Sequence, residues 1–267
     1  MTLKKMKEGI LMKKTGLLTM LCMLVLSVVS FAETAVNPAK FPKGIKNITA
    51  VTEVFGTGQK LTGVMIEYNT AVKNDKLTKE TFEVTDRTIT NVYANNKAEK
   101  AKAGKNGKFV VIELNPSDEK AQLFIKANNI LEAKVRVKQV KDIFTVNGEI
   151  AKAYSETLTN NKIQNLVVDN FKQFEYKDPK TGTTVKYNLY IPKNYNKNKK
   201  YPMVMFIHDA GPLSENTETT LLQGNGATVW ATPEEQAKHE AFVLAPQYSQ
   251  QIVDDNGNYK PDLEATV

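Results

Sequence analysis

The sequence predicts an antiparallel β-sandwich followed by an incomplete α/β sheet. Up to about residue 165, several short runs rich in β-branched residues alternate with turn residues, as in an all-β domain. Two unbroken apolar runs follow, at 203–208 and 241–246, with a helical pattern between them. Such runs fit strands that are buried on both faces of a parallel sheet covered by helices. The composition, 41% hydrophobic and 24% charged, is typical of a globular protein.

Residues 1–32 are predicted to be a secretory signal peptide. A basic start precedes an apolar core over residues 17–29, and Ser30-Phe31-Ala32 supplies the small residues of a cleavage site. The alternative is a retained membrane anchor, which the short core and the small-residue site disfavour. We therefore expect cleavage after Ala32, a secreted or extracytoplasmic location, and no membrane contact of the mature chain.

Charge and cysteine content exclude several functions. Five lysines and one glutamate of the leader account for four of the seven net positive charges, and no basic block with interleaved aromatics follows. A nucleic-acid partner is therefore not expected. The single cysteine, Cys22, lies in the leader, so the mature chain is expected to form no disulfide and no cysteine zinc site. Asp254, Asn256 and Asn258 resemble a calcium loop but lack its glycine and its final glutamate, so no metal or cofactor is expected.

Residues 33–165 are predicted to form the sandwich domain. A strand at 47–55 and its partner at 60–68 flank the turn Gly56-Thr57-Gly58. Alternation on the second strand predicts four inward side chains: Leu61, Val64, Ile66 and Tyr68. Further strands are predicted at 82–84, 88–93, 109–114, 133–140 and 143–146. This pattern indicates a sandwich of the immunoglobulin (Ig) type, and nothing in it has catalytic spacing, so we interpret it as a scaffold, lid or binding module.

Residues 166–267 carry a different pattern. In chain order they predict a β-hairpin, a buried strand, a helix and a second buried strand, at 171–191, 203–208, 233–239 and 241–246. The first buried strand ends in His208, Asp209, Ala210 and Gly211. Open α/β sheets place their ligand chemistry at the carboxyl ends of their strands, so these four residues are the candidate site.

These elements resemble a known family. The series Y-N-L-Y-I-P, Y-P-M-V-M-F-I-H-D-A-G and H-E-A-F-V-L-A-P-Q-Y resembles the opening of α/β-hydrolase esterases with an Ig-like N-terminal domain, which are similar to polyhydroxybutyrate-depolymerase-like and prolyl-oligopeptidase-like serine hydrolases. The resemblance implies that the loop His208–Gly211 supplies a backbone N–H to an oxyanion hole. His-Asp-Ala-Gly stands where His-Gly is commoner, which leaves open which N–H donates. The alternative is an ordinary strand-to-loop turn.

The nucleophile of that family is missing from these residues. The motif G-x-S-x-G does not occur, Ser214 and Ser249 lack flanking glycines, and His239 is expected on the surface. The sequence therefore predicts an N-terminal part of a longer esterase, with an incomplete α/β-hydrolase sheet over residues 166–267 and no catalytic residue in the chain. The absent fifth strand would leave the strand at 203–208 with an unpaired apolar edge.

Two functions follow from this interpretation. The leading one is a secreted serine-type carboxylic-ester hydrolase, catalytically incomplete as given, whose substrate is a small-molecule or polymeric ester. The alternative is a non-catalytic secreted binding protein that uses the Ig-like domain. Fold alone does not separate the two, and the sequence leaves the oligomeric state open.

Overall fold

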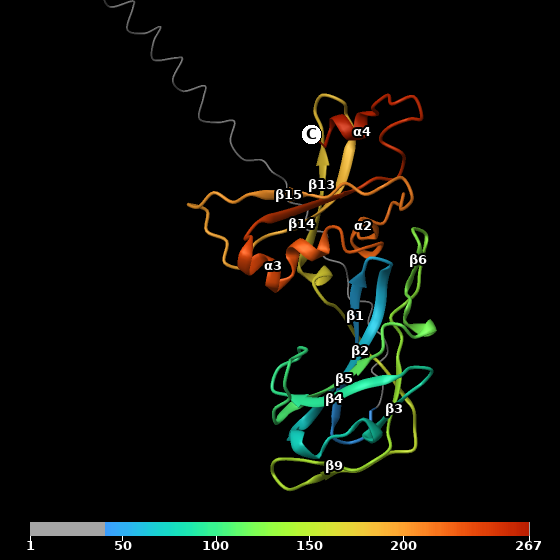
Figure 1. The fold of residues 1–267 in the computed structure, drawn as a ribbon, viewed down its shortest axis with the longest axis vertical. Coiled ribbons are helices and arrows are strands. Elements are labelled where there is room, and N and C mark those ends of the chain that lie inside the picture. The colour runs from blue at the N-terminus through green and yellow to red at the C-terminus, as the bar shows by residue number, and fades with distance from the viewer. Residues whose placement is uncertain (1–40, 267) are drawn as a thin grey trace, which may run out of the picture. The chain divides into compact units, whose positions relative to one another are not determined.

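The computed structural model describes residues 41–266 (Figure 1), and the expected signal peptide lies outside them. The strands are β1 (Ile45–Phe55), β2 (Gly58–Val72), β3 (Phe82–Val84), β4 (Ile89–Asn95), β5 (Gly107–Leu114), β6 (Phe124–Lys126), β7 (Asn129–Ile130), β8 (Arg136–Gln139), β9 (Ile143–Phe144), β10 (Ile150–Ala151), β11 (Leu158–Thr159), β12 (Lys162–Asn165), β13 (Phe171–Lys177), β14 (Thr184–Tyr190), β15 (Met203–Met205) and β16 (Phe242–Gln247). The helices are α2 (Thr219–Leu222), α3 (Pro233–Lys238) and α4 (Pro261–Glu264), with 3-10 turns η1 (Asn74–Lys76), η2 (Lys79–Thr81), η3 (Glu119–Ala121), η4 (Val168–Asn170) and η5 (Thr228–Ala231).

The first part of the described chain is built on a five-stranded sheet and a three-stranded sheet. Their strand orders are β12-β1-β2-β5-β4 and β11-β8-β3. β1 and β2 form the predicted hairpin and pair antiparallel, while β12 returns to pair parallel with β1. β5 begins at Gly107, where an added Cβ would lie only 1.9 Å from the backbone oxygen of Asn95. Glycine is therefore required where β4 and β5 come this close.

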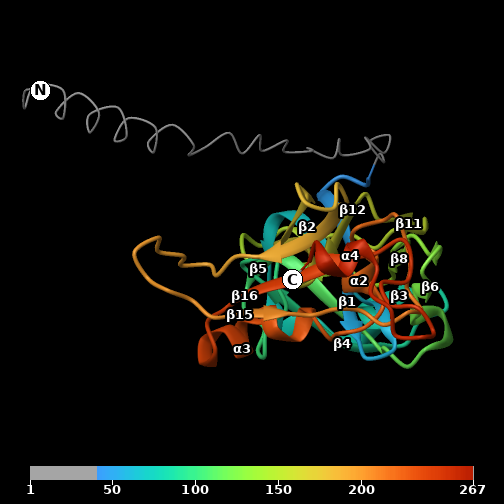
Figure 2. The ribbon, with the colours of Figure 1, turned by 90° about the horizontal axis from the view of Figure 1, so that it is seen from above.

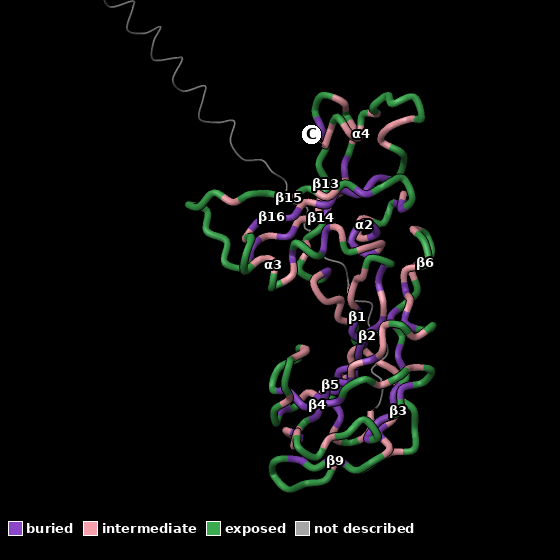
Figure 3. Tube along the Cα trace, viewed as in Figure 1, coloured by how far each residue is buried: buried purple, intermediate pink, exposed green. Residues whose placement is uncertain are grey.

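One hydrophobic cluster fills the space between these sheets. The four side chains that the sequence predicts to point inward on β2, Leu61, Val64, Ile66 and Tyr68, are all buried in it. Phe82 of β3 and Val137 of β8 enter the same cluster from the smaller sheet. Residues from both sheets thus share one core, as a sandwich requires, and Figure 3 shows the buried segments of these strands in purple.

The second part contains a four-stranded mixed sheet in the order β13-β14-β16-β15. β13 and β14 form the predicted hairpin, whose turn is held by the Asp178 carboxylate as it accepts the Thr181 N–H at 2.7 Å. β16 pairs antiparallel with β14 and parallel with β15, and Figure 2 shows β15 and β16 side by side. The predicted order of hairpin, strand, helix and strand is therefore confirmed.

Short helices cover one face of this sheet. Leu221 and Leu222 of α2 and Ala231 of η5 pack with Val243 and Ala245, which point to that face from β16. The predicted helix near residues 233–239 is α3, and the hydroxyl of Thr232 accepts the Glu235 N–H at its first turn. The buried residues of β16 are thus shielded by elements that precede it in the sequence.

The prediction that residues 203–208 are buried on both faces is wrong. β15 ends at Met205, and the side chains of Met203, Met205 and Ile207 are 58%, 38% and 38% exposed. The cause is uneven covering of the sheet: Phe206 alternates to the face under α2 and η5 and is partly buried there. The exposed side chains lie on the opposite face, which α2 and η5 do not cover.

The buried position of Ile66 gives a test of the sandwich. We expect Ile66→Ala to lower the free energy of unfolding of this part by about 2–5 kcal/mol, because Ile66 is fully buried and its truncation leaves a cavity. Ile125→Ala is the control, since that side chain is 51% exposed, and a change within about 0.5 kcal/mol is expected. Urea unfolding followed by circular dichroism measures both. Equal losses in the two variants would contradict the assigned core.

Candidate functional site

The loop His208–Gly211 lies at the carboxyl end of β15, beside the end of β16. The Phe206 N–H donates to the Leu244 carbonyl at 2.9 Å, which extends the pairing of β15 and β16 by one residue. Because these two strands run parallel, both chains leave the sheet at the same edge. The loop therefore meets Gln247, the last residue of β16, and Tyr248, which follows it.

The ring of His208 joins the two strand ends. It is 5% exposed, and its Nε2 accepts the Tyr248 N–H at 2.9 Å. Since Nε2 accepts, the ring proton is on Nδ1, which lies 2.6 Å from the Asp209 carbonyl oxygen and donates to it. Burial lowers the pKa of the His208 imidazole, and the neighbouring Asp209 opposes that shift only in part. His208 is therefore neutral at pH 7 and acts as a fixed link.

Gln247 provides a second link between β16 and the loop. Its side-chain amide is buried and donates to the Pro212 carbonyl at 2.8 Å and to the Tyr248 carbonyl at 2.9 Å. The same nitrogen lies 3.3 Å from His208 Nε2. No role for Gln247 was predicted from the sequence, although a polar residue at the end of a buried parallel strand is a signal that could have indicated one.

Some of the backbone N–H groups of the loop are already hydrogen-bonded within it. The Gly211 N–H donates to Asp209 Oδ1 at 2.8 Å, so it is not free for a ligand. Among the hydrogen bonds of the described residues, the N–H groups of Asp209 and Ala210 have no acceptor. The Asp209 carbonyl points at the His208 ring, and in a trans peptide the N–H of the next residue points the opposite way. The Ala210 N–H is therefore held away from the ring.

A small cavity adjoins the loop. Its volume is about 180 Å³, and it is lined by His208, Asp209, Ala210, Leu213, Tyr248, Gln250, Gln251, Ile252 and Val253. Three of the four residues that the sequence proposed as a site thus line one cavity, while Gly211 is not among its walls. Its lining combines apolar residues such as Leu213 and Ile252 with polar ones such as Asp209 and Gln250, as is common in sites for small molecules.

Ser214, Ser249 and His239 do not hydrogen-bond to one another or to His208. Ser214 is buried, its N–H donates to the Tyr248 carbonyl, and its hydroxyl accepts the Asn216 N–H at 3.1 Å. Ser249 is exposed, and so is His239 at the end of α3. Within residues 41–266, no serine is hydrogen-bonded to a histidine. The described residues hold no assembled serine–histidine pair.

The calcium-like sequence at Asp254 forms an ordinary loop. Both carboxylate oxygens of Asp254 accept hydrogen bonds within their own loop, from N–H groups of Asn256 and Asn258. The carboxylate therefore stabilises a turn. In the described range, no cluster of three metal-ligating side chains occurs. None of the helices between residues 41 and 266 is both long and apolar enough to cross a membrane.

Comparison with known proteins finds similarity to esterases. Residues 47–152 match the family described as the esterase Ig-like N-terminal domain. A solved structure titled as that of a thermostable esterase is similar to the chain, with a TM-score of 0.75 and 34% sequence identity. The match covers 83% of this chain and 64% of that esterase, so the chain spans less than two thirds of its length. No curated protein matches.

The first of these matches confirms the Ig-like domain that the sequence predicted. The two together confirm the resemblance to esterases with an Ig-like N-terminal domain, which was predicted from the hydrolase-like elements and the order of the parts.

The buried histidine gives a pH-dependent test of the loop. A pKa below the unfolded value of about 6.5 means that the neutral ring stabilises the fold above that pH, and this contribution is lost as the pH falls. We expect His208→Gln to reduce the free energy of unfolding more at pH 7.5 than at pH 5.5. Urea unfolding at the two pH values measures the difference.

His239→Gln is the matched control, because the chain has only two histidines and this one is exposed. It is expected to leave the pH dependence of stability unchanged. A His208→Gln effect that is the same at both pH values would show that the ring is not held neutral by the fold.

Proposed function

We propose that the chain is part of a secreted carboxylic-ester hydrolase of the serine α/β-hydrolase type. In this proposal residues 1–32 are the signal peptide, 33–165 the Ig-like domain and 166–267 an incomplete α/β-hydrolase sheet. The similarity to a thermostable esterase supports the proposal. The observation that carries it furthest is the parallel pair β15 and β16, whose common edge holds the loop His208–Gly211 beside a cavity.

The loop is proposed to bind the oxyanion of an ester during acyl transfer. A tetrahedral intermediate carries negative charge on the former carbonyl oxygen, and a positioned N–H that donates to it lowers the barrier by about 3 kcal/mol. The Gly211 N–H already donates to the Asp209 carboxylate, so the N–H groups of Asp209 and Ala210 are the donors that fit this role. His208 and Gln247 act as positioning residues, because their side chains hydrogen-bond to backbone carbonyls of the loop and its continuation and so hold the loop in place.

The nucleophile is proposed to lie outside these 267 residues. The sequence contains no G-x-S-x-G, and the hydroxyl of Ser214 is occupied by its own turn. In the proposed reaction a serine beyond residue 267 would add its oxygen to the ester carbonyl and pass its proton to a histidine that also lies beyond residue 267. The oxyanion would accept a hydrogen bond from an N–H of the loop, and the histidine would return the proton to the alcohol as the C–O bond breaks, which leaves an acyl-enzyme. Water would then hydrolyse the acyl-enzyme to release the acid and free the serine. In this proposal, these 267 residues supply the N–H donors that bind the oxyanion and no other catalytic group.

Ester hydrolysis by the purified chain tests catalytic incompleteness. We expect its hydrolysis of a short p-nitrophenyl ester to equal that of the double variant Ser214→Ala, Ser249→Ala, because neither serine is paired with a base. Release of p-nitrophenol is followed by absorbance. Hydrolysis well above background that the double variant abolishes would contradict the proposal.

Sequencing the gene past codon 267 tests the assignment to esterases. The proposal expects a reading frame that continues into G-x-S-x-G and then supplies Asp and His in that order. A stop codon directly after Val267 would instead favour the non-catalytic binding protein, and attention would move to the Ig-like domain.

A further inference from the structure

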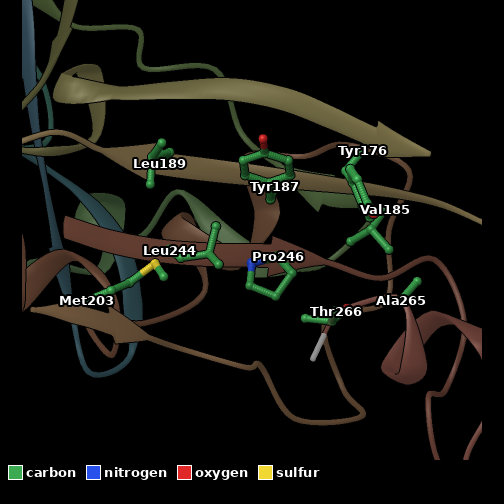
Figure 4. Close-up of a pocket in the computed structure, with 9 residues that line it drawn as sticks. All are labelled: Tyr176, Val185, Tyr187, Leu189, Met203, Leu244, Pro246, Ala265 and Thr266. Carbon is green, nitrogen blue, oxygen red and sulfur yellow. The ribbon is translucent and has the colours of Figure 1, made fainter. Parts of the chain in front are cut away.

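The hairpin β9–β10 exposes apolar side chains for which the proposed function gives no role. Another apolar surface is the hollow of about 340 Å³ on the second sheet, which Figure 4 shows lined by Tyr187, Leu189, Leu244 and Met203. Under the proposed function, further strands of that sheet would cover this hollow. The hairpin instead lies within residues 47–152, which match the Ig-like domain. Its exposed side chains therefore need a separate explanation.

The hairpin β9–β10 and the second part of the structure contact opposite ends of β2. Thr145 forms an antiparallel bridge with Val72, the last residue of β2. At the other end, beside the turn between β1 and β2, Val54 packs against the cluster that contains Leu221 and Val243. β2 has 15 residues, so its two ends are roughly 45 Å apart. Covering of the second sheet therefore does not account for the hairpin.

The apolar side chains of the hairpin alternate outward from the sandwich. Ile143 and Thr145 are buried. Phe144 and Val146, which alternate with them, are 46% and 49% exposed, and Figure 3 shows the hairpin labelled β9 mostly in green. Ile150 pairs with Phe144, so it lies on the same face, and it is 44% exposed. A strand face that meets water usually carries polar side chains, and here three apolar ones stand in their place.

Backbone hydrogen bonds hold these side chains in fixed positions. The Lys73 N–H donates to the Phe144 carbonyl at 2.9 Å, and the Val146 N–H donates to the Ala71 carbonyl at 2.8 Å. Gly148, in the turn of the hairpin, has a φ of 87°, which glycine adopts without strain. Because the backbone is already ordered, docking of this surface costs little further conformational entropy.

A lysine lies beside the exposed apolar side chains. Because Val72 pairs antiparallel with Thr145, the next pair along the two strands is Lys73 and Phe144. Directly opposed residues place their side chains on the same face. Among the ion pairs of the described residues, none involves Lys73. Its ammonium group is therefore available to an anion next to the Phe144 ring.

The positive charge continues into the neighbouring segments. The Asn74 N–H donates to Asn106 Oδ1 at 2.8 Å, which brings residues 105–108 beside the end of β2. Residues 71–76, 105–108 and 141–152 together contain six lysines and three acidic residues. The acidic ones are Asp75, Asp142 and Glu149. The surface around the apolar side chains is thus positive.

We propose that the hairpin β9–β10 docks the protein onto an anionic lipid surface. Phe144, Val146 and Ile150 enter the boundary between headgroups and acyl chains, and the lysines face the anionic headgroups. A protein partner fits this surface less well, because lysine is depleted in protein–protein interfaces. The proposal replaces the expectation, drawn from the signal peptide alone, that the mature chain makes no membrane contact. It concerns the Ig-like domain and does not depend on ester hydrolysis.

Co-sedimentation with lipid vesicles tests the docking. The test uses residues 33–267, which contain every described residue, so that the apolar leader cannot itself bind lipid. We expect binding to vesicles made of equal parts of phosphatidylglycerol and phosphatidylcholine. Binding to phosphatidylcholine alone should be roughly tenfold weaker or less, because the lysines then have no anionic headgroup to face. Added salt should weaken the first interaction more than the second.

Matched variants separate the apolar contribution from the electrostatic one. We expect the double variant Phe144→Ala, Ile150→Ala to bind the anionic vesicles roughly tenfold more weakly, because less apolar surface leaves water. Ile125→Ala, an exposed site near the other end of β2, should bind as the unchanged chain does. Lys73→Gln should lower the affinity more than Lys120→Gln, an exposed lysine of η3. Circular dichroism checks that all four are folded.

A single dye reports insertion into the lipid. Residues 33–267 contain no cysteine, so Val146→Cys can carry one environment-sensitive fluorophore. We expect its emission to shift to the blue on anionic vesicles and that of the same dye on Ile125→Cys to stay unchanged. Absence of binding to the anionic vesicles would overturn the proposal, and so would binding that the double alanine variant leaves intact. A dimer in solution that this variant dissociates, without vesicle binding, would overturn it in favour of self-association.

Discussion

The pairing of β16 on both sides is the constraint on which the second part of the structure depends. Its antiparallel partner β14 ties in the hairpin, and its parallel partner β15 delivers His208 to the same edge as Tyr248. The side chains of Val243 and Ala245 also give α2 and η5 the surface on which they pack. Loss of β16 would therefore remove the sheet, its covered face and the loop geometry at once.

Two side chains decide which polar groups of the loop remain available. The neutral ring of His208 binds the Asp209 carbonyl, and the Asp209 carboxylate binds the Gly211 N–H. Asp209 stands where glycine is commoner in this loop, and this has a structural consequence. Its carboxylate accepts the Gly211 N–H, which a glycine at position 209 would leave free. Among the described hydrogen bonds, the N–H groups of Asp209 and Ala210 remain, and the planar peptide between residues 209 and 210 orients the second of them.

Local pattern was sufficient where neighbours in sequence are neighbours in space. Alternation on β2 predicted four of its buried side chains, although it missed Met65, which is buried on the opposite face, and turn residues predicted both hairpins. The exposure of Met205 could not be predicted in this way, because an unbroken apolar run does not show which face of the sheet other elements cover. The same limit applies to Gln247, whose partners come from a distant loop, and to Val167, whose φ of 70° is imposed by tertiary structure on a β-branched residue.

A neutral His208 fixes the loop between β15 and β16. The ¹⁵N NMR spectrum of the imidazole at pH 7, assigned with the His239→Gln variant, tests this directly. We expect a protonated Nδ1 and an unprotonated Nε2 that accepts the Tyr248 amide N–H. An imidazolium, or a neutral ring protonated at Nε2, would contradict the geometry from which the oxyanion loop is argued.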